Sequence, residues 1–421
     1  MTAKTGRQLG VSVGGERGAA LVRNLARRGY RLAVADRRNR ADPVDHPLVR
    51  SVATLPQLVA ATGPDRVLML LDAAGNELDR LLGRLTPLLD PGDVIVDGGA
   101  ARFGDTSRRA AGLRATGLRF AGCGITGDPA LIEHGPAYVV GGDRAAHARI
   151  APILAATAAR MQNVPCVAYA GAAGAGDFAL MVHDELAAAE HRLIIEVGTL
   201  LRAGLGRSAA QTADVLAGWA GLVPSQVLDA ARTVLQRPDP PGWREFGDVL
   251  ELPVGGDGLP GVRNALDLAV PVTVAAEAVA ARTRRWTSTT VPAEPAALLA
   301  VTADDIRTGW YAARVVAYAQ GFQQLSVAGR AYGWGMDAAA VAGAWRGGTA
   351  LDGRLLTFVR EAFTADPDGH LLADPYFADV IHHALPPWRR VVTAATTAGL
   401  PVPAHAAAQQ FVTGRLVTGT R

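Results

Sequence analysis

The first 170 residues alternate short apolar runs with helical patterns, and this alternation limits the fold more than any other feature of the chain. Runs with the length of strands lie at residues 9–13, 31–35, 66–71 and 94–97, with further candidates at 120–123 and 138–140. Strands that are apolar along their whole length are buried on both faces, as in a parallel sheet covered by helices. We therefore predict an α/β, Rossmann-like, doubly wound domain.

The second part of the chain has a different character. Strand patterns fade after about residue 171, and a long helical pattern without proline covers about 177–203. Most of the remaining sequence is helical, with clear Pro/Gly-rich breaks at 237–242 and 253–261. We predict a Rossmann-like dinucleotide-binding domain over residues 1–175 and a large all-helical domain over residues 176–421.

The composition excludes several classes of partner. Formal net charge is +3, and no Lys/Arg run with interleaved aromatic residues points to nucleic acid. No segment is long and apolar enough to span a membrane and the N-terminal residues lack an apolar leader, so we expect a cytoplasmic protein. Cys123 and Cys166 belong to no metal-binding or disulfide pattern, and we predict no metal site.

Residues 10–18 (GVSVGGERG) contain part of a dinucleotide-binding fingerprint. Such a fingerprint needs glycines for a tight turn, for close approach of the pyrophosphate and for helix packing. Gly15 and Gly18 match the second and third roles, but Val13 replaces the first glycine. Two interpretations stay open: a working nucleotide site, or a Rossmann domain that has kept its fold and lost its ligand.

The end of the second predicted strand bears on the choice of cofactor. Asp36 is placed to accept hydrogen bonds from a ribose diol, whereas Arg37, with Arg38 and Arg40 after it, is suited to a 2′-phosphate. We therefore predict Gly15, Gly18, Asp36 and Arg37 as cofactor-binding residues. The choice between NADP and NAD stays open.

Segments spread between about residues 9 and 410 carry a family resemblance. They include NLARRGYRLAVADR (24–37), DPGDVIVDGG (90–99), DTSRR (105–109), GCGITG (122–127), GAAGAGDFALMVHDEL (171–186), ALDLAVP (265–271) and AYAQGFQQL (317–325). In this order they resemble the decarboxylating 6-phosphogluconate dehydrogenase family of the β-hydroxyacid dehydrogenase superfamily. The resemblance implies a Rossmann-like domain and a helical domain, NAD(P), a small-molecule substrate and a homodimer.

The chain departs from that family at the positions that carry its chemistry. The family's long helix reads Lys-x-x-x-Asn-x-x-Glu, and the resemblance places Leu180, Asp184 and Ala187 at these three positions. The general base and the proton donor of the family are thus both missing. By the same resemblance, its phosphate-binding Lys and Arg fall at Leu259 and near Val291. The resemblance implies a substrate pocket lined by Gly98, Gly99, Thr126, Gly127, Leu180 and Ala187.

Lys4 is the only lysine of the chain, and it lies in a polar N-terminal segment. No other lysine can therefore act as general base or as phosphate clamp. A phosphate left without a cation in a buried pocket costs roughly several kcal/mol. We expect a neutral or amine/imine-type substrate instead of a phosphorylated one, as in the imine reductases of the same superfamily, which are similar in having replaced this lysine.

Asp184 and His183 are the predicted catalytic residues. Asp177, Asp184 and His191 are spaced by seven, which places them on one face of a helix. A partly buried aspartate has a raised pKa and can donate a proton near neutrality, so Asp184 is the first candidate and His183 the second. The alternative is that Asp184 pairs with an arginine or with water and that His183 is a packed core histidine.

Two functions remain in competition. The first is a divergent NAD(P)-dependent oxidoreductase acting on a non-phosphorylated substrate, without decarboxylation of 6-phosphogluconate. The second is a catalytically inactive pseudoenzyme that binds or regulates a partner. Side chains that fill the N-terminal end of the first predicted helix would weigh against the oxidoreductase.

Overall fold

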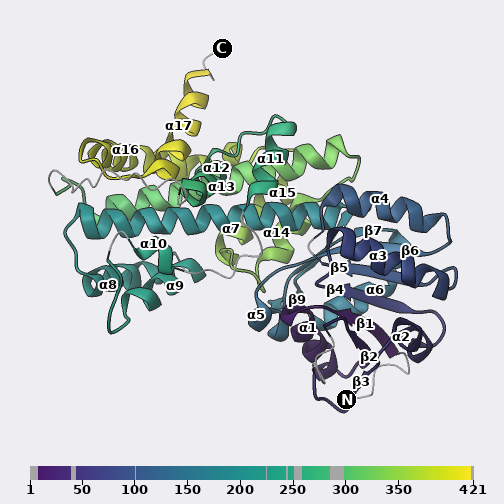
Figure 1. Ribbon diagram of the computed structural model, residues 1–421. Helices are drawn as coiled ribbons and strands as arrows, with labels where there is room; N and C mark the ends of the chain where they lie inside the picture. Colours follow the sequence, from purple (N-terminus) through teal and green to yellow (C-terminus); the bar gives the residue numbers. More distant parts are fainter. Residues whose placement is uncertain are drawn as a thin grey trace. The chain divides into compact units, whose positions relative to one another are not determined.

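The computed structural model describes residues 8–38, 44–99, 101–223, 225–242, 245–250, 258–284 and 298–418. Lys4, Arg40 and Val291 lie outside these ranges. The chain divides into two compact units (Figure 1). Unit 1 comprises Met1–Leu180 and Ala328–Thr349, and unit 2 comprises Met181–Val327 and Ala350–Arg421.

Unit 1 is built on an eight-stranded sheet with the order β10-β7-β6-β5-β4-β1-β2-β3. Its strands are β1 (Gln8–Val13), β2 (Arg31–Asp36), β3 (Val49–Ser51), β4 (Val67–Leu71), β5 (Val94–Gly98), β6 (Arg119–Ile125), β7 (Tyr138–Gly142) and β10 (Val167–Gly171). All neighbours are parallel except β6 and β7, which pair antiparallel. β8 (Arg160–Met161) and β9 (Val164–Pro165) form a separate short hairpin.

Helices cover both faces of this sheet, as predicted for a doubly wound domain. One core contains Val67, Met69 and Leu71 of β4 together with α1 (Glu16–Arg27), α5 (Pro129–His134) and α6 (Arg144–Thr157). The other contains Leu68 and Leu70 together with α2 (Leu55–Thr62), α3 (Gly75–Leu85) and α4 (Phe103–Arg114). Side chains alternate between the faces of a strand, so an unbroken apolar run such as β4 serves two cores.

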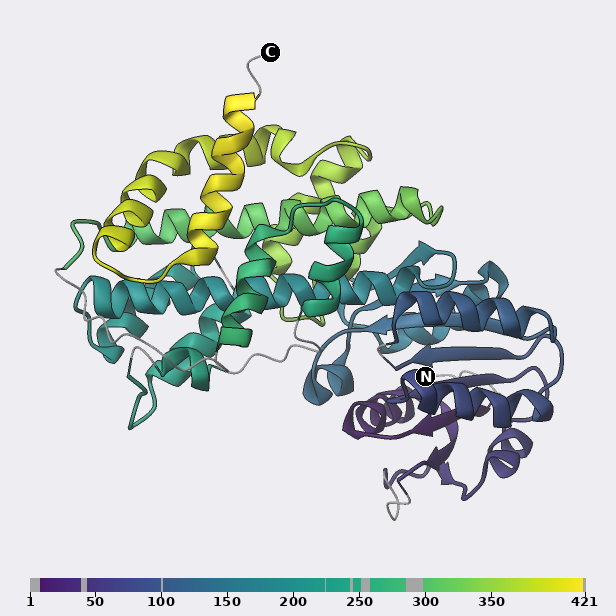
Figure 2. The ribbon, with the colours of Figure 1, turned by 45° about the horizontal axis from the view of Figure 1, so that its top comes forward.

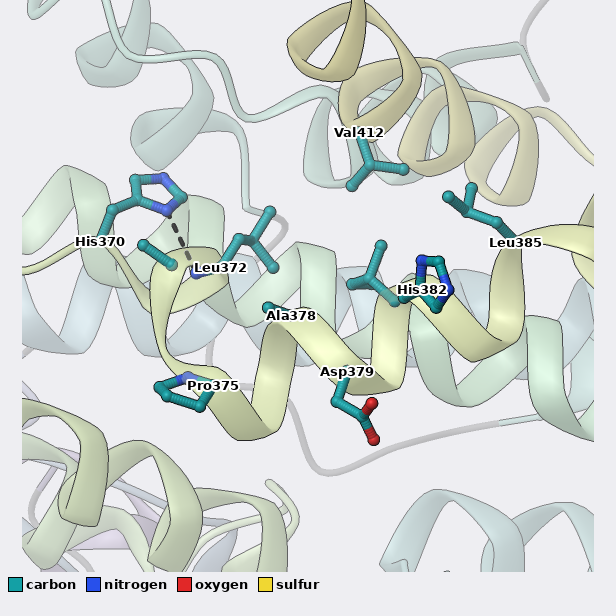
Figure 3. Close-up of a pocket in the computed structure, with 10 residues that line it drawn as sticks. His370, Leu372, Pro375, Ala378, Asp379, His382, Leu385 and Val412 are labelled. Carbon is teal, nitrogen blue, oxygen red and sulfur yellow. Dashed lines mark hydrogen bonds between the residues drawn. The ribbon is translucent and has the colours of Figure 1, made fainter. Parts of the chain in front are cut away.

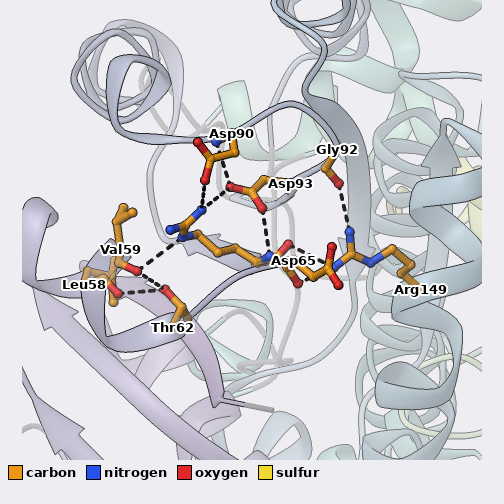
Figure 4. A network of polar contacts seen from close by, with 9 residues as sticks. Leu58, Val59, Thr62, Asp65, Asp90, Gly92, Asp93 and Arg149 are labelled. Carbon is orange, nitrogen blue, oxygen red and sulfur yellow. Dashed lines mark hydrogen bonds and ion pairs between the residues drawn. The ribbon is translucent and has the colours of Figure 1, made fainter.

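A polar network holds the amino ends of β4 and β5 together (Figure 4). Arg66 Nη1 lies 2.7 Å from Asp90 Oδ2 and 3.0 Å from Asp93 Oδ2, and the Arg66 amide donates to Asp93 Oδ1 at 2.8 Å. Arg149 of α6 adds a bond to the carbonyl of Gly92 at 2.8 Å. These contacts stabilise the amino ends of the strands. The predicted site residues of unit 1 follow the opposite, carboxyl ends, where ligands of such sheets bind.

The second part of the chain is helical (Figure 2). A long helix, α7 (Ala175–Thr199), is followed by a π-helical turn (Leu200–Gly204). The others are α8 (Ala209–Ala220), α9 (Gln226–Leu235), α10 (Phe246–Val249), α11 (Leu259–Asp267), α12 (Thr273–Arg284), α13 (Ala303–Ala331), α14 (Ala338–Trp345), α15 (Gly353–Ala365), α16 (Pro375–Thr397) and α17 (Pro403–Thr418). α14 belongs to unit 1, where it contacts β10 and β7.

A buried ionic triad joins three helices of unit 2. Arg314 of α13 donates to Glu190 Oε2 of α7 at 2.7 Å and to Asp352 Oδ2 at 2.9 Å. Asp352 also caps α15 by accepting from the amides of Arg354 and Leu355. In the part of the chain that the structure describes, no helix has the length and apolar character of a membrane span.

Candidate functional site

The turn between β1 and α1 contains the predicted fingerprint. Val13 is fully buried as the last residue of β1 and pairs in register with Asp36, the last residue of β2. The two strands thus carry the glycine turn and the predicted ribose-binding carboxylate to the same edge of the sheet. Glu16 faces away from the turn, since its carboxylate lies 2.6 Å from Arg23 Nη2 farther along α1.

Asp72 occupies the N-terminal end of α1. It follows β4, the strand beside β1, and its Oδ2 accepts a hydrogen bond from the Gly18 amide at 2.9 Å. A Cβ atom added to Gly18 would lie 2.4 Å from this oxygen, and one added to Gly15 would lie 3.1 Å from the Asp72 Cγ. The space that these glycines leave is therefore filled by the Asp72 carboxylate.

Arg37 covers the same turn. Its Nη2 donates to the Leu71 carbonyl at 2.9 Å and its Nη1 to Ser12 Oγ at 3.1 Å. Its Nε lies 3.0 Å from Glu77 Oε1, and Nη2 lies 2.2 Å from the position of a Cβ on Gly14. Instead of extending to solvent beside Asp36, the guanidinium is thus folded back onto the glycines.

Little space remains between the start of α1 and the end of β4. The void lined by Gly18, Asp72 and Gly98 holds about 10 Å³, which is the room of a single water molecule. Arg17 closes it further by donating to the Ile125 carbonyl at 2.7 Å. The fold and the glycines suit a dinucleotide, but the Asp72 carboxylate already accepts from one of the amides at the start of α1, which are the groups that bind phosphate in such folds.

Gly98 and Gly99, both predicted for the substrate pocket, have a packing reason to be glycine. A Cβ on Gly98 would lie 2.7 Å from Leu71 Cδ2, and one on Gly99 would lie 1.9 Å from the Ala73 carbonyl oxygen. The chain after β5 therefore runs directly against the chain after β4. This close contact alone excludes any side chain at Gly99.

Two buried carboxyl groups, those of Asp97 and Asp177, lie near the end of β5. Asp97 is fully buried and accepts from the Gly99 amide at 3.0 Å, and burial raises its pKa to about 7. Asp177 of α7 has its pKa raised well above the ordinary value by burial and then by the charge of Asp97. Among the described residues, neither Oδ2 atom has a hydrogen-bond partner. The pair therefore retains at least one proton around neutral pH.

Thr126 and Gly127 lie at the end of β6, and their local contacts are structural. The Thr126 hydroxyl donates to the Gly348 carbonyl at 2.7 Å and accepts from the Ala137 amide at 3.0 Å. Gly127 has φ +94°, a conformation that favours glycine. Leu180 of α7 packs against β6. A Cβ atom placed on Gly124 of that strand would lie 2.9 Å from the Leu180 Cβ.

The predicted catalytic residues belong to the α7 segment of unit 2. His183 Nδ1 lies 3.1 Å from Asp184 Oδ1, so the two adjacent side chains form a pair. The His183 side chain is almost completely buried, whereas the carboxylate of Asp184 keeps 15% of its surface exposed. Ala187 is buried at 2% exposure.

The neighbouring Glu185 is a buried acid that the sequence patterns did not single out. It is 1% exposed, and burial raises its pKa to about 8, so it carries a proton at neutral pH. It packs against the first turn of α11, where a Cβ on Gly261 would lie 2.3 Å from its Oε2. The Gln324 side chain, which affects the Glu185 pKa, donates to the Gly261 carbonyl at 2.9 Å.

A cavity of about 690 Å³ lies elsewhere in unit 2 (Figure 3). It is lined mainly by α16, with His370, His382 and Asp379 among apolar side chains, and it contains none of the predicted site residues. His370 accepts from the Leu372 amide at 3.1 Å, so this nitrogen is already engaged. Over the described ranges, no group of three or more His, Cys, Asp or Glu side chains is arranged to hold a metal.

Sequence reasoning overlooked two carboxylates, and each left a signal. Asp72 directly follows the buried strand 66–71, so a pairing of that strand with the first would have placed it at the glycine turn. Glu185 stands one residue after Asp184 on the same helix. Its burial depends on the packing of α11, which the helical pattern did not reveal.

The comparisons with known proteins agree with this architecture. Residues 9–171 match the model of the NAD binding domain of 6-phosphogluconate dehydrogenase, and residues 176–417 match that of the 6-phosphogluconate dehydrogenase C-terminal domain. The decarboxylating 6-phosphogluconate dehydrogenase of Chlamydia pneumoniae is 33% identical over 94% of this chain and 87% of its own length. That of Schizosaccharomyces pombe is 34% identical over 86% of this chain and 76% of its own length.

A solved structure shows the same fold. The 6-phosphogluconate dehydrogenase of Plasmodium falciparum superimposes with a TM-score of 0.86 at 21% identity, covering 98% of this chain and 93% of that one. Both predicted parts of the fold, the Rossmann-like sheet and the large helical part, are thereby confirmed. The chain belongs to the 6-phosphogluconate dehydrogenase family of oxidoreductases.

Proposed function

We propose that this protein is an NAD(P)-dependent oxidoreductase that acts on a non-phosphorylated, neutral or amine/imine-type substrate and does not decarboxylate 6-phosphogluconate. One observation carries the substrate part: beyond Lys4 the chain contains no lysine, and the matching positions are Leu180 and Leu259. A leucine can neither take a proton nor pair with a phosphate. The oxidoreductase part rests on membership of the family.

The charge of the buried groups supports a substrate without phosphate. Asp97 and Asp177 in unit 1, and Glu185 in unit 2, are buried carboxyl groups with raised pKa values. An anion placed near any of them would raise these pKa values further or be repelled. A neutral or protonated amine or imine meets no such penalty.

Glu185 joins Asp184 and His183 as a candidate proton donor. It holds its proton at neutral pH because it is buried, and it is the next residue after Asp184 on α7. A carboxylic acid with a pKa near the working pH is suited to general acid catalysis. The Glu185→Gln variant keeps the shape of the side chain and removes the proton, so it separates this role from packing.

The proposal further includes a cytoplasmic homodimer that uses either NADP or NAD. These features rest on the family resemblance. Asp36 and Arg37, at the end of β2, are the residues proposed to distinguish the two cofactors.

A second function is favoured by a specific observation. The Asp72 carboxylate accepts from the Gly18 amide, and the Arg37 guanidinium lies against Gly14. A protein that kept this arrangement permanently would be a pseudoenzyme that serves as a binding or regulatory partner. The two proposals differ in whether the wild-type protein consumes a dinucleotide in the presence of any substrate.

The deciding experiment follows NADPH and NADH absorbance with the purified protein and a panel of cyclic imines, ketones and hydroxyacids. 6-Phosphogluconate with NADP⁺ or NAD⁺ serves as the contrasting reaction. We expect turnover of an imine or ketone, reduced in Glu185→Gln or in Asp184→Asn, and no oxidation of 6-phosphogluconate. Reduction of NADP⁺ with 6-phosphogluconate would contradict the substrate assignment, and inertness toward the whole panel would favour the pseudoenzyme.

A further inference from the structure

Asp72 connects the end of β4 with the helix that should receive a phosphate. Its Oδ2 accepts from the Gly18 amide at 2.9 Å, and its backbone takes φ +59°, a left-handed conformation that is uncommon outside glycine. We propose that Asp72 is a built-in competitor for the dinucleotide pyrophosphate and thereby sets the affinity of this protein for NAD(P). This inference rests on the proposed function insofar as NAD(P) is the ligand.

The Asp72 carboxylate takes up the space that a phosphate would need. It lies in contact distance of the Cβ positions of both Gly15 and Gly18. Gly15 is the position where a fingerprint glycine lets the pyrophosphate approach the backbone, and Gly18 is the one that packs the helix closely against the strand. The void beside Gly18 and Asp72 holds about 10 Å³, which is the room of one water molecule. A dinucleotide therefore reaches the Gly18 amide only after Asp72 has moved away.

The charge of Asp72 competes with a phosphate as well. The N-terminal end of a helix attracts an anion through its free amides and its dipole. Asp72 satisfies that demand with a carboxylate from the same chain. A pyrophosphate near the same amide would face this like charge, so binding includes the cost of removing Asp72 from a favourable position.

Arg37 supports Asp72 in this position. It donates to the carbonyl of Leu71, which is the peptide group joined to Asp72, and is itself braced by Ser12 and Glu77. We call Asp72, Gly18, Leu71 and Arg37 the Asp72 latch. When the carboxylate leaves, the guanidinium beside Gly14 remains as a cation at the turn. Opening the latch thus converts a site that excludes anions into one that attracts them.

The test uses two substitutions that act on different parts of the latch. Asp72→Asn keeps the size of the side chain and removes its charge. Asp72→Gly removes charge and volume, and glycine tolerates the left-handed backbone. Asp65→Asn is the matched control, because Asp65 also has a positive φ of +54° and is exposed on the loop before β4. Circular dichroism and thermal unfolding confirm that each variant is folded.

Calorimetric titration of the full-length proteins with NADPH and with NADH gives the readout, which needs no substrate. We expect weak binding by the wild type and by Asp65→Asn, and affinity at least about tenfold tighter in Asp72→Gly, with a smaller gain in Asp72→Asn. Equal affinities in wild type and both Asp72 variants would overturn the latch and leave the proposed function intact. Absence of binding in every variant would overturn the latch and also the proposed cofactor, since an opened site would then still reject dinucleotides.

Discussion

The Oδ2 atom of Asp72 lies 2.9 Å from the amide nitrogen of Gly18, although 54 residues separate them in the chain. The contact arises because β4 lies beside β1 in parallel, with Ser12 opposite Leu70, so both chains leave the sheet at the same edge. The first helix of the Rossmann-like sheet thus receives a carboxylate of its own chain at its N-terminal end. The proposed cofactor must compete with this contact.

Glu185 makes the stability of the protein depend on pH. Its folded pKa is raised from 4.5 to about 8, so the folded state holds a proton that the unfolded state releases above about pH 4.5. Its contribution is fully present below that pH and is lost as pH rises through about 8. We expect the free energy of unfolding to fall by on the order of a few kcal/mol over this interval.

Urea unfolding at a series of pH values checks this expectation with Glu185→Gln. The neutral glutamine has no charge to bury, so the variant should lose less stability than wild type between about pH 5 and pH 8. Glu361→Gln, at an exposed helical position, should follow the wild-type curve. Parallel curves for wild type and Glu185→Gln would show that Glu185 ionises as easily as a surface glutamate.

The Asp97–Asp177 pair predicts a second pH effect, in unit 1. The Asp97 pKa is raised from 3.8 to about 7 by burial, so its contribution to stability is lost as pH rises through about 7. In Asp97→Asn the amide oxygen can still accept from Gly99, and the charge next to Asp177 is gone. We expect this variant to gain thermal stability relative to wild type at pH 8 and to lose that advantage at pH 5. The exposed Asp368→Asn is the control, and a pH-independent difference for Asp97→Asn would contradict the raised pKa of Asp97.

Arg314 should be among the most sensitive residues of unit 2. Replacing it by methionine leaves Glu190 and Asp352 buried without their cation, since all three side chains are at most 3% exposed. Breaking such a buried network by removing one partner costs about 3–5 kcal/mol. Arg307→Met removes an exposed pair with Asp304 and should cost at most about 1 kcal/mol. Similar urea midpoints for the two variants would mean that the triad contributes no more than a surface ion pair.

Gly99 tests the close contact between the chains that follow β4 and β5. A Cβ atom there would lie 1.9 Å from the Ala73 carbonyl oxygen, so Gly99→Ala forces the two segments apart. We expect a loss of about 2 kcal/mol or more in the free energy of unfolding. Gly112→Ala, within α4 and with open space around its Cβ position, should instead stabilise by about 0.5–1 kcal/mol. An unchanged free energy of unfolding in Gly99→Ala would mean that packing does not require glycine at this position and that only ligand binding could.

The sequence was sufficient for the fold class because the fold is encoded in local periodicity. Apolar runs such as residues 66–71 and 94–97 predicted β4 and β5. Their side chains point alternately to the two faces of the sheet and so contribute to both cores. The antiparallel strand β7 was not predicted to differ from its neighbours. The direction of β7 follows from its connection to β6 through the short helix α5. An apolar sequence pattern does not reveal this direction.

The sequence by itself also determined what this protein lacks. Lys4 is the only lysine of the chain, so no fold of it can bring a second lysine into any site. Only the tertiary structure decided where the carboxylates lie: Asp72 on the amide of Gly18, Asp97 near Asp177, and Glu185 against Gly261. Composition and periodicity are properties of the chain alone, whereas burial and proximity depend on which distant segments pack together. Burial and proximity set the charge and the accessibility of each group.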